Sequence, residues 1–331
     1  MYYADKTQSL REIFGAAVLH VEADRIVVDG RTLPVVDDVI VCLGASQWSP
    51  RLGARLGGTR SVESGPADFA EDIQYTFGAE WQTFSSIVPD HETAFEQYFD
   101  LIDLSELGRA RVCDLGCGMG RWSYFMSRRC REIVLVDFSE AIFVARRNLR
   151  ERANAIFVMA DIRRLPFAPD FADLLFCLGV LHHLPTPVLD EVVALQRYAR
   201  RLLIYVYYAL DNRPPHFRAL LALVTGIRTR FAHLRNERLR HGLAILIALS
   251  VYRPLVGLGH SMRPFGLEHR IPLYESYRGK SLRAVTQDAY DRFFTRIEQR
   301  VSRKDIKTLE AAFSRVSISD RLPYWHFVCE R

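Results

Sequence analysis

The chain has 331 residues, which is enough for two domains or for one domain with insertions. Its hydrophobic share of 49% and charged share of 25% are typical of a soluble globular protein and exclude a disordered or fibrous chain. The formal net charge is +5, and Met1 is not followed by a basic region and an apolar region, so we predict no secretory signal. No apolar run reaches the roughly 18 residues expected of a membrane span.

Cysteine usage indicates the compartment. The six cysteines include no C-x-x-C pair, and most fall inside apolar segments that read as strands. We therefore predict buried free thiols in a reducing compartment, not zinc ligands or disulfides, and a cytoplasmic chain that holds no metal. The cysteines are at positions 42, 113, 117, 130, 177 and 329.

Residues 1–60 are predicted to form a separate, small β-rich module. Apolar runs at 25–30 and 33–43 flank an Asp-Gly turn, as two strands of a hairpin would. The run resembles a zinc-ribbon-like module found in front of some methyltransferases, but the paired ligand cysteines of that module are absent. The segment is either a packing or dimerisation arm or a regulatory, substrate-recruiting element.

Residues 61–107 are predicted to be a linker followed by helices. The linker expectation rests on the glycine-rich run 51–65, and the helical pattern begins near Asp68. Phe77, Trp81 and Phe84 lie in a Phe-Gly-x-x-Trp-x-x-Phe run that resembles a stretch before the glycine loop of related bacterial methyltransferases, where N-terminal helices cover the cofactor. They either cover a ligand or pack this helix on the domain.

A glycine-rich turn at 111–123 organises the central segment, 108–209. Val112 to Leu115 reads as a strand, Gly116, Gly118 and Gly120 space a tight turn, and a helix is expected from Met119 to Arg129. A dinucleotide fingerprint would need glycine at 121, where Arg121 stands, which disfavours a nicotinamide oxidoreductase. The pattern Asp-x-Gly-x-Gly-x-Gly resembles the motif of class I S-adenosylmethionine-dependent methyltransferases.

Three further apolar runs support this resemblance. They end at Asp137, at Asp161 and at Val180, and the last continues into Gly-Val-Leu-His-His-Leu-Pro, which resembles the ubiquinone and menaquinone biosynthesis branch of the family. The resemblance implies an α/β fold with a doubly wound, seven-stranded, mostly parallel sheet of Rossmann-like type. Residues 303–331 are expected to close the sheet with a capped helix and two strands, usually antiparallel.

The same resemblance implies S-adenosylmethionine as the cofactor. In the family, an acid at the position of Asp137 holds the ribose, an acid at the position of Asp161 faces the adenine amino group, and the end of the fourth strand lines the methionine part. The predicted cofactor-binding residues are Phe77, Trp81, Asp114, Gly116, Cys117, Gly118, Gly120, Arg121, Asp137, Phe138, Asp161, Ile162 and Leu178.

His182 and His183 follow the fourth strand, where a general base for a hydroxyl acceptor would be placed. They are the predicted catalytic residues. The other interpretation is that the pair only shapes the loop. Six tyrosines are candidates to line an acceptor pocket, although we expect most of them to be core or rim residues: Tyr205, Tyr207, Tyr208, Tyr274, Tyr277 and Tyr290.

Residues 210–302 form an insertion with a local charge. Residues 211–270 hold ten Arg, no Lys and three acids, a formal charge of +7, so the rest of the chain sums to −2. Apolar runs at 219–224 and 243–252 lie among the arginines. Three interpretations stay open: a lid for an anionic or lipid-like acceptor, a peripheral contact with the inner membrane surface, or a helical cap with solvated arginines.

The predicted function is methyl transfer to a small molecule, with a hydroxyl of a saccharide, lipid or secondary metabolite as the leading acceptor. One alternative is a noncatalytic S-adenosylmethionine-binding regulatory module, and another is the nicotinamide-dependent oxidoreductase. Nucleic acid is disfavoured, since aromatic residues are not interleaved with the arginines. The sequence leaves the acceptor and the oligomeric state open.

Overall fold

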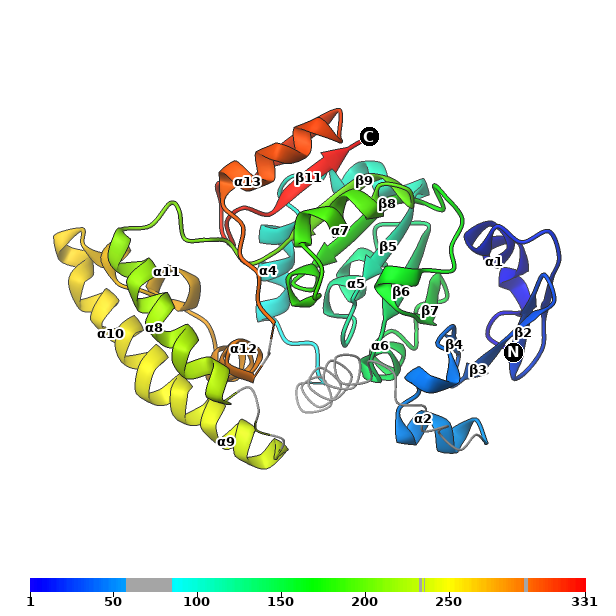
Figure 1. The fold of residues 1–331 in the computed structure, drawn as a ribbon, viewed down its shortest axis with the longest axis horizontal. Helices are drawn as coiled ribbons and strands as arrows, with labels where there is room; N and C mark the ends of the chain where they lie inside the picture. The colour runs from blue at the N-terminus through cyan, green and yellow to red at the C-terminus, as the bar shows by residue number, and fades with distance from the viewer. Residues whose placement is uncertain (58–84, 232–233, 235, 295–296) are drawn as a thin grey trace.

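The protein is built on one twisted sheet of eleven strands, with the insertion as a helical lobe beside it (Figure 1). The computed structural model describes residues 1–57, 85–231, 234, 236–294 and 297–331. Across the sheet the strands follow the order β1-β2-β3-β4-β7-β6-β5-β8-β9-β11-β10.

Seven of these strands form the predicted class I core. The strands β5 to β9 run parallel, whereas β11 pairs antiparallel with both β9 and β10. This confirms the predicted α/β doubly wound architecture and its antiparallel closing pair. The strands are β5 (Arg111–Leu115), β6 (Glu132–Asp137), β7 (Ala155–Met159), β8 (Ala172–Leu178), β9 (Ala199–Tyr205), β10 (Arg315–Ile318) and β11 (Phe327–Glu330).

The order of the strands locates the ligand site. From β5 the chain moves outward to β6 and β7, then returns to the other side of β5 to form β8 and β9. Ligands of open α/β sheets bind outside the carboxyl ends of the strands at this reversal point. The glycine turn follows β5 and the His-His pair follows β8, so both lie at the reversal.

The N-terminal strands extend the core sheet and are not the separate unit that we predicted. They are β1 (Leu19–Val21), β2 (Arg25–Val28), β3 (Arg31–Val36) and β4 (Val39–Val41). Strand β4 pairs in parallel with β7, which would otherwise be an open edge. The Tyr3 hydroxyl accepts a hydrogen bond from the backbone N–H of Phe157 (3.1 Å) and donates one to the carbonyl of Asp38 (2.6 Å). Sequence periodicity does not reveal such long-range pairing.

Helices cover both faces of the sheet. One face packs against α1 (Thr7–Phe14), α7 (Val188–Leu195) and α13 (Arg303–Lys307), and α13 begins at the predicted Ser302 cap. Among the described residues, the other face packs against four helices, of which α2 lies where we expected a linker. These are α2 (Pro50–Arg55), α4 (Asp90–Tyr98), α5 (Arg121–Met126) and α6 (Ala141–Asn148).

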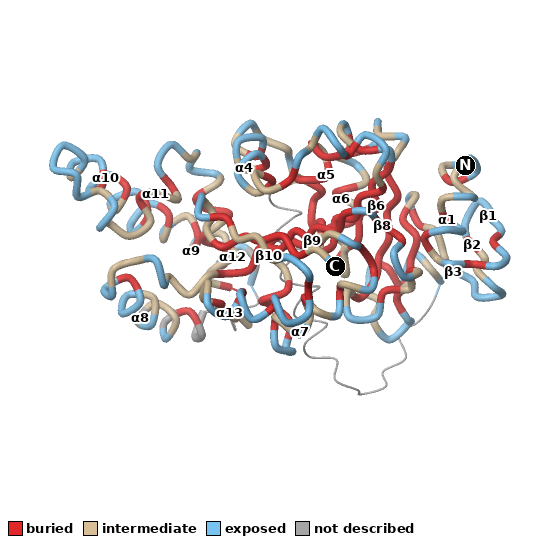
Figure 2. Tube along the Cα trace, turned by 90° about the horizontal axis from the view of Figure 1, so that it is seen from above, coloured by how far each residue is buried: buried red, intermediate tan, exposed pale blue. Residues whose placement is uncertain are grey.

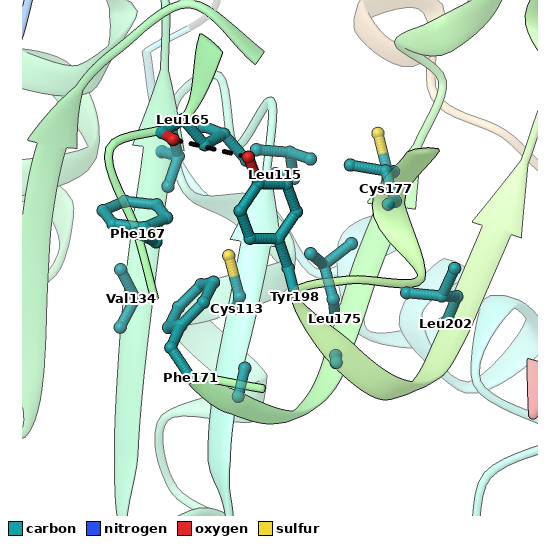
Figure 3. Close-up of a cluster of buried hydrophobic side chains, with 14 of the residues drawn as sticks. Cys113, Leu115, Val134, Leu165, Phe167, Phe171, Leu175, Cys177, Tyr198 and Leu202 are labelled. Atoms are coloured by element: carbon teal, nitrogen blue, oxygen red, sulfur yellow. Dashed lines mark hydrogen bonds between the residues drawn. The ribbon is translucent and has the colours of Figure 1, made fainter. Parts of the chain in front are cut away.

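The central strands are buried on both faces, so neighbouring residues serve different cores. Val134 packs with the α7 side and Leu135 with the α5 side. Figure 3 shows the first of these cores, where the Tyr198 hydroxyl donates to the carbonyl of Leu165 at 3.3 Å. Five of the six cysteines are buried free thiols and Cys42 is half-buried. In Figure 2 the buried trace runs through β6, β8 and β9.

The insertion has a hydrophobic core of its own. Its members include Ala248, Tyr252, Tyr274, Tyr290 and Phe294, and none belongs to the two sheet cores. The helices are α8 (Pro215–Phe231), α9 (Glu237–Ile247), α10 (Arg253–Met262), α11 (Tyr274–Tyr277) and α12 (Leu282–Phe294). A π-helical turn, Ala248–Tyr252, joins α9 to α10.

Our expectation that no segment is long enough to cross a membrane was wrong in one respect. The joined helices run without a break from Arg238 to Phe265, and this helix is long and apolar enough to span a bilayer by length and composition. The Arg at 253 does not interrupt it, because its long side chain is tolerated on an exposed helix face. Only 28% of its most apolar stretch is buried.

Candidate functional site

The glycine turn after β5 has the backbone that its sequence predicts. Gly116, Gly118 and Gly120 all have positive φ, at 79°, 53° and 79°. A Cβ on Gly116 would lie 2.4 Å from a methyl carbon of Val180, and one on Gly120 would lie 2.8 Å from Leu149. These glycines are therefore needed both for the turn and for the close approach of β8 and α6.

Asp137 ties the turn to the end of β6. Its carboxylate accepts hydrogen bonds from the backbone N–H of Gly118 (2.8 Å) and from the backbone and hydroxyl of Ser139 (2.8 and 2.7 Å). Burial raises the pKa of Asp137, although these hydrogen bonds oppose the shift. The carboxylate also lines a cavity at the reversal point, so it can accept hydroxyl donors of a ligand there.

Asp114 stabilises the glycine turn from the buried interior and not from the cavity. It is almost wholly buried, and it accepts a hydrogen bond from the Ser123 hydroxyl at 2.6 Å, which joins β5 to α5. Burial raises the pKa of Asp114 to about 7. Asp114, Gly118 and Gly120 do not line the cavity, so these three act on the shape of the turn.

The other predicted cofactor residues that the structure describes do meet in this cavity, whose volume is about 170 Å³. Phe77, Trp81 and Phe84 lie outside the described residues. Asp161 closes one end and is paired with Arg163 at 2.9 Å. The predicted residues that line the cavity are Gly116, Cys117, Arg121, Asp137, Phe138, Asp161, Ile162 and Leu178.

This lining fits S-adenosylmethionine. The carboxylate of Asp137 suits the donating hydroxyls of a ribose, and Phe138, Ile162 and Leu178 supply the apolar walls that an adenine ring requires. The turn brings bare backbone to the same cavity, because any side chain at Gly116 would collide with Val180.

The two histidines have different surroundings. His182 is fully buried, its ring lies 4.0 Å from the Tyr207 ring, and its nitrogens have no hydrogen-bond partner among the described residues. Burial, with help from the neighbouring His183 and Arg300, holds the pKa of His182 well below its usual range. Only His183 lines the cavity.

The tautomer of His183 follows from its partner. Its Nδ1 lies 2.7 Å from the backbone carbonyl of Ile297, which can only accept a hydrogen bond. Nδ1 therefore carries the proton of the neutral ring, and Nε2 carries the lone pair. Nε2 lies 4.0 Å from Oδ1 of Asp291, and the other oxygen of Asp291 accepts a hydrogen bond from the Tyr207 hydroxyl at 2.7 Å.

Helix α12 supplies residues that the sequence analysis missed. Gln287, Asp288, Asp291 and Arg292 all line the cavity. Their spacings of one turn place them on one helix face, and this is the signal that could have found them. Nothing in the sequence, however, placed that face over the sheet.

The predicted acceptor tyrosines fall into three groups. Tyr205 and Tyr207 line the cavity, while Tyr208 and Tyr277 line a second cavity within the insertion. Tyr274 and Tyr290 belong to the core of the insertion and line neither cavity. We expected most of the six to be core or rim residues, but four of them line one or both cavities.

Comparison with known proteins agrees with the geometry. A family model described as a methyltransferase domain matches residues 112–202. The chain is 29% identical over 157 residues to a ubiquinone biosynthesis O-methyltransferase of Hahella chejuensis, which covers 46% of this chain and 63% of the relative. It is 32% identical over 151 residues to one of Aromatoleum aromaticum, with 44% and 62% covered.

These matches span less than two thirds of each relative. Among solved structures, a methyltransferase of Bacillus halodurans is similar over 40% of this chain and 59% of its own, with 21% identity and a TM-score of 0.35. The matched segment contains the glycine turn, both acids and the His-His pair. Residues 112–202 therefore match a methyltransferase domain, and the cavity beside them fits S-adenosylmethionine as the cofactor.

Proposed function

We propose that this chain is an enzyme that transfers a methyl group to a hydroxyl oxygen of a small molecule. The observation that carries the proposal is the 2.7 Å contact between His183 Nδ1 and the Ile297 carbonyl, which leaves the lone pair of the neutral ring on Nε2 of a side chain that lines the cofactor cavity. A lone pair held at that place suits a general base for a hydroxyl acceptor.

Different residues bind the cofactor and accept the proton. Asp137, Asp161, Phe138 and the glycine turn hold S-adenosylmethionine, which supplies a methyl group on a positively charged sulfur when it is bound. His183 Nε2 accepts the proton that the acceptor hydroxyl loses when its oxygen takes the methyl group. The rest of the acceleration comes from alignment of the two reactants, which can supply roughly 7–11 kcal/mol.

Asp291 is a positioning residue in this scheme. Its carboxylate, 4.0 Å from His183 Nε2, stabilises the imidazolium that forms when the proton arrives. Tyr207 holds that carboxylate through its hydroxyl. The insertion therefore takes part in the chemistry through α12, which distinguishes an enzyme from a noncatalytic cofactor-binding module.

An oxygen acceptor has support from the relatives. The Hahella and Aromatoleum proteins are named O-methyltransferases of ubiquinone biosynthesis. A hydroxyl of a saccharide, lipid or secondary metabolite remains the acceptor class that we propose.

We place the chain in the cytoplasm, with a peripheral contact at the inner membrane surface as a second role. The observation that favours the contact is a set of exposed apolar side chains along the continuous helix Arg238–Phe265, among them Leu246, Leu249, Leu258 and Phe265. Apolar residues beside arginines are typical of elements that lie on an anionic bilayer.

The experiment is to incubate the purified chain with S-adenosylmethionine that carries a deuterated methyl group and with fractions of a cell extract. We expect release of S-adenosylhomocysteine together with one product whose mass shift only the labelled donor can give. The matched control is Asp137→Ala, which should release far less. If wild type binds S-adenosylhomocysteine but no fraction yields a labelled product, the noncatalytic alternative is favoured.

A further inference from the structure

A second cavity lies inside the insertion. Its volume is about 330 Å³, against about 170 Å³ for the cofactor cavity. Helix α8, the π-helical turn, α10 and the end of α12 contribute to its wall, which is largely apolar. Six of the apolar side chains are Phe217, Leu221, Val224, Leu255, Ile271 and Phe293.

The two cavities share a wall. Tyr205, Tyr207 and Arg292 line both of them. Tyr207 also donates to Asp291, the carboxylate that faces His183. A molecule bound in the second cavity therefore lies next to the residues that we assign to proton transfer.

The second cavity carries a positive charge. Four arginines and two glutamates line it, so the formal charge of its lining is +2. Arg213 pairs with Glu275 at 2.7 Å, while Arg228 and Arg300 share Glu298 at 2.5 and 2.6 Å.

Arg292 is different from these three arginines. No ion pair of Arg292 is found among the described residues, and its guanidinium lies over the rings of Tyr207 and Tyr277 at 5.4 and 6.0 Å. Its position at the shared wall makes it the cation best placed to receive an anionic group at that end of the cavity.

The lining also selects among acceptor classes. A saccharide needs a hydrogen-bond partner for each buried hydroxyl, and the apolar side chains that form most of this wall offer none. An apolar body gains free energy in such a site, at about 25 cal/mol per Å² of surface removed from water. Leu220 and Val251 line the cavity and are 39% and 43% exposed, so the cavity reaches the surface between α8 and the π-helical turn.

We propose that the second cavity is the acceptor site, and that the acceptor is an amphiphile with an apolar body and an anionic group that Arg292 receives. The inference rests on the proposed function and specifies its substrate. The apolar body lies between α8 and α10, and the reacting hydroxyl faces the shared wall.

The test uses the full chain saturated with S-adenosylhomocysteine and three monomeric probes. Dodecyl phosphate has both features of the ligand, dodecanol has only the apolar chain, and inorganic phosphate has only the anion. Calorimetry should show dodecyl phosphate binding at least about tenfold more tightly than either of the others.

Two matched variants locate the site. Leu255→Trp fills the cavity, whereas Leu258→Trp makes the same change on the same helix at a residue that is 44% exposed and does not line it. Leu255→Trp should weaken dodecyl phosphate binding at least about tenfold and Leu258→Trp less than about twofold. If Leu255→Trp does not fold, Val224→Trp and the exposed Ala222→Trp on α8 repeat the comparison.

Arg292→Met should abolish the preference for dodecyl phosphate over dodecanol while leaving dodecanol binding in place. The inference is overturned if wild type binds S-adenosylhomocysteine but not dodecyl phosphate, or if the two tryptophan variants of one helix weaken binding equally. It is also overturned if inorganic phosphate binds as tightly as dodecyl phosphate. Failure of wild type to bind S-adenosylhomocysteine would instead refute the proposed function.

Discussion

The cofactor half of the molecule, 108–209, and the insertion, 210–302, are built in different ways. In the cofactor half, each strand residue serves one of two cores that share the sheet, and the ligand-binding residues stand directly after the strands. The insertion packs around a separate core of its own and reaches the site mainly through one face of α12. Cofactor recognition is therefore local in sequence, whereas the acceptor side is assembled from distant segments.

The largest expected effect concerns His183, which lies where the cofactor half and the insertion meet. His183→Ala should lower turnover by about 10²–10⁴, because the base for the acceptor hydroxyl is lost. Affinity for S-adenosylhomocysteine should stay nearly unchanged, since His183 is not among the groups that hold the ribose or adenine. Turnover is measured with the acceptor found in the extract fractions.

The neighbouring His182→Ala is the matched control. His182 lines neither of the two cavities described above, so its loss should reduce thermal stability by opening a space beside Tyr207, with a smaller effect on turnover per folded molecule. Equal and small losses of turnover for both variants would mean that the pair only shapes the loop.

How much of this could be predicted from the sequence also differs between the two regions. The glycine turn, Asp137 and Asp161 were predicted because a short motif fixes both their backbone and their place at the strand ends. Asp291 and Arg292 were not, because only the packing of α12 over the sheet brings them to the cavity. The pairing of β4 with β7 was missed for the same reason: it joins residues more than 100 positions apart.

The second effect concerns the buried acid of the cofactor half. Because the pKa of Asp114 is raised to about 7 in the folded state, its protonated form is favoured there. The buried, protonated carboxyl therefore contributes to the stability of the fold. This contribution is fully present below about pH 4 and is lost as the pH rises through about 7. At about 1.4 kcal/mol per pKa unit, it amounts to at most about 4 kcal/mol.

Asp114→Asn should remove the loss of folding stability at high pH, because an amide does not ionise, while it keeps an acceptor for the Ser123 hydroxyl. The melting temperature of the cofactor-free variant should exceed that of wild type more at about pH 8 than at about pH 5. A variant that is destabilised equally at both values would show that the carboxylate is ionised throughout and needed as such.

The third effect tests cofactor recognition itself. Asp137→Ala removes charge-assisted hydrogen bonds, which should weaken S-adenosylhomocysteine binding by about 1.5–3 kcal/mol. Calorimetry measures this directly. The control is Asp291→Ala in the insertion, because the comparison between the two regions requires that its cofactor affinity remain close to that of wild type.

The smallest effect refines the role of α12. Asp291→Asn keeps an acceptor for the Tyr207 hydroxyl but removes the charge 4.0 Å from His183. We expect turnover to fall by about tenfold, equivalent to about 1.4 kcal/mol, because the imidazolium loses its counter-charge. The acid side of the pH profile of turnover should shift to lower pH, because the protonated and inactive form of His183 is less favoured without the carboxylate. An unchanged profile would give Asp291 a purely structural role.

One titration tests the central claim most directly, namely that the glycine turn and its two acids form an S-adenosylmethionine site. Purified wild-type chain is titrated calorimetrically, without added metal, with S-adenosylhomocysteine and, separately, with NAD. We expect saturable binding of one S-adenosylhomocysteine per chain and no detectable heat from NAD. Binding of NAD without binding of S-adenosylhomocysteine would contradict this claim.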